Sequence, residues 1–162
     1  MARYRSNLSL GTSGLEDFSA ATKALTKINR DLPRDFKNSV TTTAKELRDL
    51  ARIRALQEPA AGKSGSTGLR ADVAKGVGIV QIKDGVRVVT SMPNRNEAII
   101  PRGMDGIKGW RHPVFGNKNN WVRQTSGTES WFLDTMRDGH TPLRERLERN
   151  LQDAADTVDN AS

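Results

Sequence analysis

Apolar residues in the first third of the chain recur at three- and four-residue steps, which is the spacing of one face of an α-helix. Residues 14–29 carry such a stripe, and Ser13 with Glu16 three positions later has the capping-box pattern of a helix start. Pro33 interrupts the stripe and predicts a kink or a new first turn, because proline lacks an amide donor and restricts the residue before it. A second long helix is then predicted up to Glu58-Pro59.

The hydrophobic period changes after residues 59–68, a segment of small polar residues and glycines that predicts an extended loop. Residues 77–90 consist of two β-rich runs around Asp84-Gly85, a dipeptide suited to a tight type I′ turn. We therefore expect a β-hairpin there. The residues expected to meet on one face across its turn are Val80, Ile82, Val86 and Val88.

The region after this hairpin alternates irregular and regular patterns. Residues 91–108 contain two prolines and two glycines and predict a second extended loop, an excursion from the sheet. Residues 109–124 are typical of a strand, a turn and a second strand, with the turn at Gly116–Asn120.

The C-terminal third predicts helix. One or two helical turns begin near Trp131 and break at Gly139, after which Thr141 and Pro142 are suited to the cap and first position of a final helix. Its apolar stripe runs from Leu143 to Val158. The expected fold class is α+β, with long N-terminal helices, a small antiparallel sheet with its hairpin at 77–90 and a C-terminal helix, in one domain spanning residues 1–162.

Composition narrows the class of protein. The 162 residues include no cysteine, which excludes disulfides, thiolate metal sites and cysteine nucleophiles. No window approaches the roughly 20 consecutive apolar residues of a membrane span, and no apolar run follows the basic N-terminus. These patterns predict a soluble, unexported protein that does not enter a membrane.

The net charge of +7 is unevenly placed. Residues 1–128 carry 22 basic and 11 acidic side chains, whereas residues 129–162 carry 4 basic and 8 acidic ones. Such an excess attracts a phosphate backbone, or it pairs with an acidic tail supplied by a neighbouring copy. The acidic residues with which we expect a neighbour to pair are Asp153, Asp156 and Asp159.

Motifs for catalysis and for cofactor or metal binding are absent from the sequence. His112 and His140 stand apart without a metal-binding spacing, and Gly62-Lys63-Ser64 lacks the glycine five positions earlier that a phosphate-binding loop requires. Most carboxylates lie on predicted helices beside basic residues, as in solvated ion-paired faces. The chain is therefore expected to be no enzyme and to hold no cofactor or metal.

The segment Gly109–Gln124 differs from the rest because it combines two tryptophans with basic residues. Its large side chains, Trp110, Phe115 and Trp121, are read either as core residues or as the anchors of a protein interface. A third interpretation is that they stack nucleic-acid bases. The candidates for contacting a subunit or DNA are Arg111, Lys118 and Arg123, and a free nucleic-acid-binding module would add Arg3 and Arg5.

Residues 109–117, which read GWRHPVFGN, and residues 121–124, which read WVRQ, resemble the neck or tail-completion proteins of long-tailed bacteriophages, a group related to the minor tail protein Z family. The order of the elements is similar too, including a Ser66–Arg70 segment that enters a strand. Pro33 and the excursion at 91–108 depart from shorter relatives. The residues that carry this structural signature are Trp110, His112, Pro113, Phe115, Gly116 and Trp121.

The resemblance implies a structural subunit at the head-to-tail junction of a virion, made in the host cytoplasm. Copies of such a subunit are expected to form a ring of about six or twelve around the passing genomic DNA. Its implied neighbours are the head-closure or stopper protein and the tail-terminator or tail-tube protein. The resemblance assigns no catalytic residue and implies that the HPVFGN motif is a structural turn.

Overall fold

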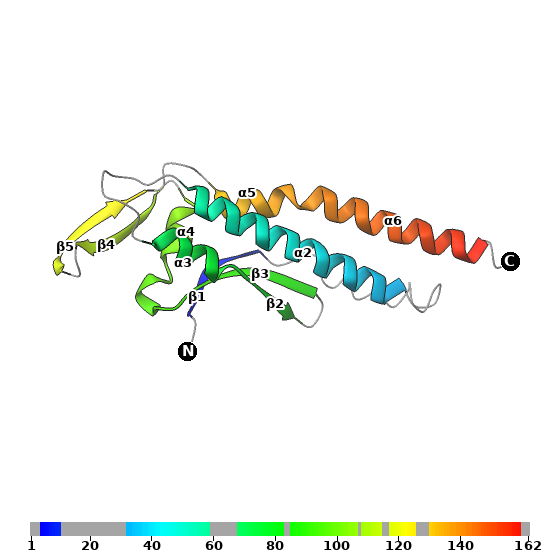
Figure 1. The fold of residues 1–162 in the computed structure, drawn as a ribbon, viewed down its shortest axis with the longest axis horizontal. Coiled ribbons are helices and arrows are strands. Elements are labelled where there is room, and N and C mark those ends of the chain that lie inside the picture. The colour runs from blue at the N-terminus through cyan, green and yellow to red at the C-terminus, as the bar shows by residue number, and fades with distance from the viewer. Residues whose placement is uncertain are drawn as a thin grey trace.

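A computed structural model describes residues 4–10, 32–58, 68–82, 85–106, 108–114, 117–125 and 130–159 of the chain. Two long helices, α2 (Leu32–Gln57) and α6 (His140–Asp159), run antiparallel and side by side along the length of the molecule (Figure 1). A small sheet lies beneath α2, and a separate β-hairpin lies at the end opposite the C-terminus. The predicted α+β class is confirmed.

The remaining elements are short. They are β1 (Tyr4–Leu10), α3 (Leu69–Gly76), β2 (Gly78–Ile82), β3 (Gly85–Met92), η1 (Arg95–Glu97), α4 (Ile100–Met104), β4 (Trp110–Val114), β5 (Asn117–Gln124) and α5 (Trp131–Asp138).

Helix α2 is the centre of the fold, because α3, α5, α6 and β3 all pack against it. Its described part begins at Leu32, with Pro33 in the first turn, and the helix ends at Gln57, next to the predicted boundary. The residues before Leu32, on which the predicted kink or restart depends, lie outside the described residues. Its buried face includes the small residues Ala44, Ala51 and Ala55, which allow close approach by neighbouring backbones. The same helix also buries Phe36 and Val40, so it contributes both small and larger side chains to the core.

The sheet has the strand order β1–β3–β2 and is antiparallel throughout. A hairpin at 77–90 is confirmed, but the predicted register is wrong by one residue. Ile82 pairs with Gly85, so Gly85 belongs to β3 rather than to the turn. Ile79 therefore lies opposite Val88, and Val80 lies opposite Arg87 instead of sharing a face with Val86 and Val88. A shift of one residue exchanges the two faces of a strand, because successive side chains point to opposite sides.

Three further elements differ from expectation. Residues 69–76 form helix α3, although the resemblance implied entry into a strand. The region 91–108 is not one extended loop, because β3 continues to Met92 and η1 and α4 follow. Strand β1 was not predicted and pairs with β3. In each case tertiary contacts override a weak local pattern, since Ile100 and Met104 of α4 are buried in the core.

The C-terminal helices follow the prediction closely. Helix α5 covers the expected turns after Trp131, but α6 already begins at His140, so only Gly139 separates the two helices and Thr141 lies inside α6. The predicted helix at 14–29 and most of the predicted loop at 59–68 lie outside the described residues.

A single buried cluster joins these layers. It contains Phe132 and Trp131 of α5, whose rings meet edge to face with centroids 5.5 Å apart. The seam between α2 and α6 is more polar. Arg146 donates to Thr43 Oγ1 at 2.9 Å, and Asn150 donates to Ser39 Oγ at 2.8 Å. These bonds add to the contacts of Leu143 and Leu147 with the core in holding α6 along α2.

Candidate interaction surface

The β4–β5 hairpin extends from one end of the molecule (Figure 1). Its ladder pairs Arg111 directly with Arg123 and Pro113 with Trp121. Directly opposed residues of an antiparallel pair lie on the same face, and residues two apart on one strand also share a face. Arg111, Pro113, Trp121 and Arg123 therefore form one surface, called here the outer face of the hairpin.

The outer face is exposed. Arg111 and Arg123 are both exposed, and Trp121 keeps 47% of its surface accessible. Of the interpretations left open by the sequence, the core interpretation is therefore wrong for Trp121. It is confirmed for Trp110, which is only 5% exposed and belongs to the core cluster. The core interpretation therefore applies to Trp110 on one face of the hairpin, whereas Trp121 on the other face is available for an interface.

Trp110 of β4 packs against α4 at the base of the hairpin. A Cβ atom added at Gly103 would lie only 2.7 Å from the Trp110 Cβ, so the absence of a side chain at Gly103 lets the tryptophan approach. Gly109, just before β4, has φ of +61°, a left-handed conformation that favours glycine. These two glycines fix where the hairpin leaves the body of the protein.

The far end of the hairpin is irregular. Val114 pairs with Asn117, and the ladder then shifts before Pro113 pairs with Trp121, so residues 118–120 form a bulge in β5. Asn117 Oδ1 accepts from the Asn119 amide at 3.0 Å within this bulge. The backbone of Lys118 lies in the bulge, while Phe115 and Gly116 of the signature lie outside the described residues.

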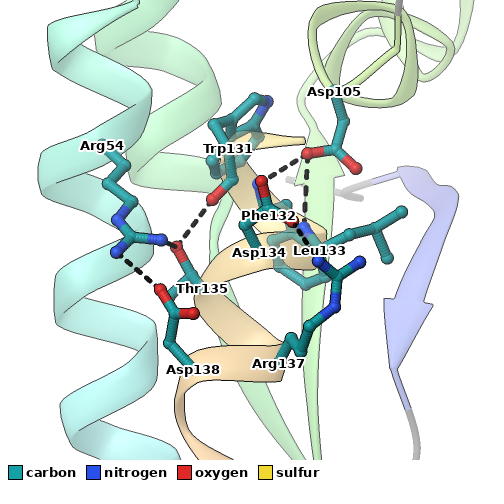
Figure 2. A network of polar contacts seen from close by, with 9 residues as sticks. All are labelled: Arg54, Asp105, Trp131, Phe132, Leu133, Asp134, Thr135, Arg137 and Asp138. Atoms are coloured by element: carbon teal, nitrogen blue, oxygen red, sulfur yellow. Dashed lines mark hydrogen bonds and ion pairs between the residues drawn. The ribbon is translucent and has the colours of Figure 1, made fainter. Parts of the chain in front are cut away.

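Asp105 ties the two ends of the hairpin segment together (Figure 2). Its carbonyl oxygen accepts from the Ser130 amide at 3.0 Å, and its carboxylate Oδ1 accepts from the amides of Phe132 at 2.5 Å and Leu133 at 3.3 Å. Asp105 therefore caps the N-terminus of α5 from a distant part of the chain. Ser130, the residue at the usual cap position, is left-handed at φ 60° and makes no side-chain cap bond.

Residue Asp105 is only 4% exposed, and this burial raises the pKa of its carboxyl group to about 6. The amides of Phe132 and Leu133 lower the pKa in part, while the negative charges of Asp134 and Glu58 raise it. Among the described residues, Asp105 Oδ2 finds no hydrogen-bond partner. The Asp105 carboxylate thus caps α5, although burial makes its charged form unfavourable.

Arg54 of α2 binds two polar side chains of α5, Thr135 and Asp138 (Figure 2). Its guanidinium donates to Thr135 Oγ1 at 3.1 Å and pairs with Asp138 at 2.8 Å, while Thr135 donates to the Trp131 carbonyl at 2.6 Å. Asp105 and Arg54 were not singled out from the sequence. Their partners are 27 or more residues away, and only the folded chain brings them together.

The acidic candidates lie at the other end of the molecule. Asp153 and Asp156 are exposed on the last turns of α6, and Asp159 ends the helix. The structure does not bring them near Arg111 and Arg123 of the same chain, because the hairpin and the end of α6 lie at opposite ends of the long axis (Figure 1). Any pairing between these groups has to occur between molecules.

The two histidines are also separate. His112 is partly buried, with Nδ1 3.2 Å from the Pro113 carbonyl oxygen, and His140 is exposed at the start of α6. Over the described ranges, no group of three or more acidic or histidine side chains is arranged to hold a metal ion. None of the helices within those ranges has the length and apolarity to cross a bilayer.

Comparisons with known proteins give no further assignment: no family model matches the chain, and no curated protein or solved structure shows significant similarity to it.

Proposed function

We propose that this chain is a structural subunit of the head-to-tail junction of a long-tailed bacteriophage, where its copies form a closed ring around the DNA conduit. The proposal combines the resemblance at residues 109–124 with one observation: a basic hairpin and an acidic helix end lie at opposite ends of the molecule (Figure 1). Rings are built from heterologous interfaces, in which one face meets a different face on the next copy. Oppositely charged ends supply two such faces.

The remaining parts of the proposal follow from this role. The ring would stack between a head-closure or stopper protein and a tail-terminator or tail-tube protein in the virion, after synthesis in the host cytoplasm. The subunit would hold its neighbours in position rather than catalyse a reaction, and it would need no cofactor. An assembly subunit also suits a chain of 162 residues, because association between copies adds buried surface that a small chain lacks.

The mass of the purified protein tests this proposal. Light scattering over a range of concentrations is expected to approach a fixed multiple of the 17.8 kDa subunit, and electron microscopy is expected to show closed rings. A folded protein that stays monomeric at every concentration, both alone and with isolated necks, would contradict it. Circular dichroism distinguishes that result from misfolding, since the helical signal should be retained.

A second candidate is a free nucleic-acid-binding module, and the outer face of the hairpin favours it. Two arginines beside an exposed tryptophan resemble the combination of phosphate contacts and base stacking used by single-strand binders. Binding of short single-stranded DNA should then weaken steeply with salt, with a slope of about −0.7 per phosphate contacted. Titrations at several salt concentrations check this, and a flat profile would exclude the module.

A further inference from the structure

The outer face of the hairpin places two like charges directly opposite each other. Arg111 and Arg123 are cross-strand partners, and like charges directly opposite each other destabilise a sheet. The sequence from residue 106 to 128 adds Lys108 and Lys118 and contains no acidic residue. No carboxylate of the described ranges forms an ion pair with either guanidinium in the structure. An anion bound across both arginines would remove their repulsion.

The end of α6 has the opposite imbalance. After Arg149 the chain carries Asp153, Asp156 and Asp159 and no basic residue. The C-terminus of a helix is the negative end of its dipole, where acidic side chains are unfavourable and cations are stabilising. Asp153 and Asp156 are exposed on this end. Asp156 Oδ1 accepts from Gln152 Nε2 at 2.7 Å, and both aspartates remain accessible to a further cation, which this end of the helix dipole favours.

The two sites also match in spacing. Cross-strand partners such as Arg111 and Arg123 have Cβ atoms about 4.5–5.5 Å apart. Residues three apart on a helix, such as Asp153 and Asp156, have Cβ atoms about 5–6 Å apart. Each guanidinium can then face one carboxylate, and the planar fork of arginine is suited to binding a carboxylate through two hydrogen bonds.

We infer that the outer face of the hairpin binds the acidic end of α6 in a second copy of this chain, with Arg111 and Arg123 facing Asp153 and Asp156. This inference rests on the proposed function, because it specifies the heterologous contact of the ring. A second copy is favoured over nucleic acid because the chain itself provides a carboxylate pair of matching spacing at its opposite end. Trp121, on the same face, adds aromatic area of the kind enriched in protein interfaces.

Charge exchange tests this contact. The variants are R111E/R123E, D153K/D156K and the combination of all four changes, each measured by sedimentation for the dissociation constant of self-association. Either double variant should weaken association by about tenfold or more, and the combination should recover most of the loss, because the pairs are restored with reversed sign. The matched control for R111E/R123E is K37E/K45E, two exposed lysines of α2, which changes the net charge by the same amount and should leave association nearly unchanged.

The outcomes separate this contact from the proposed function. If the wild-type protein associates but the double variants associate equally well, or the combination recovers nothing, the contact is wrong while the ring proposal stands. A folded wild-type protein that never associates overturns both. If R111E/R123E loses binding to a short DNA oligonucleotide but keeps its self-association, the outer face is a nucleic-acid surface and the inference is overturned.

Discussion

Asp105→Asn is expected to stabilise the protein at about pH 8 and to leave its stability nearly unchanged at about pH 4. Asparagine can keep the cap of α5, because its amide oxygen can accept from Phe132 and Leu133 as Asp105 Oδ1 does. It carries no charge that burial would penalise. Its amide nitrogen takes the position of Oδ2, which is buried without a partner among the described residues, so the gain comes from the missing charge and not from a new hydrogen bond.

The expected size of this effect follows from proton linkage. The folded-state pKa of Asp105 is raised from 3.8 to about 6, so the folded protein binds the proton more tightly than the unfolded chain does. The stability from protonated Asp105 is fully present below about pH 4 and is lost as pH rises through about 6. The loss above pH 7 is roughly 3 kcal/mol. The asparagine variant should lack this loss.

Urea unfolding at several pH values measures the difference between the two proteins. Asp134→Asn is an informative control, because it keeps the Asp105 carboxylate but removes a negative charge that raises its pKa. That variant should move the transition to lower pH without abolishing it. A difference between wild type and Asp105→Asn that stays constant from pH 4 to pH 8 would disprove the assignment to Asp105.

Phe132→Ala is expected to lower the free energy of unfolding by about 3–5 kcal/mol, the usual cost of removing a buried aromatic ring. The Phe132 side chain is fully buried, packs edge to face with Trp131 and lies in the turn of α5 that Asp105 caps. Alanine would leave a cavity that the surrounding helices cannot fill. For a domain stable by about 5–15 kcal/mol, this is a large fraction of the total.

The neighbouring residue provides a matched control. Leu133 belongs to the same helical turn and its amide bonds the same carboxylate, but its side chain is 39% exposed. Leu133→Ala should therefore cost clearly less than Phe132→Ala when both are compared by denaturant unfolding at one pH. Equal losses would indicate that helix propensity, rather than the packing of the ring, determines the stability of α5.

Elements with a long periodic pattern could be predicted from the sequence. The stripe beyond Pro33 and the Leu143–Val158 stripe correspond to α2 and α6. Leu143 and Leu147 of the second stripe pack against the core. Hairpin 77–90 was also predictable as an element. Its register was not, since the apolar alternation placed Val80 and Ile82 on one face with Val86 and Val88, whereas the observed pairing of Ile82 with Gly85 places the two pairs on opposite faces.

The candidate surface was predictable only in part. Arg111, Lys118 and Arg123 could be selected by residue type, but a sequence does not reveal which faces of a hairpin are buried. Trp110 and Trp121 have similar neighbours along the chain, yet the paired strands place Trp110 against Gly103 and leave Trp121 exposed. Asp105 could not be identified either, because its role depends on amides 27 and 28 residues later.

The near-continuity of α5 and α6 has a mechanical consequence. Gly139 joins them in helical geometry, and its amide and carbonyl continue the bonds to Thr135 and Leu143. A side chain at Gly139 would collide with Leu47 of α2, so the joint is also pressed against the central helix. The two helices thus form an almost continuous helical segment that runs from the acidic end of α6 to the N-terminus of α5, where the Asp105 carboxylate is bound. In the proposed ring, a displacement at one contact of a subunit would be transmitted along this segment toward its other contact.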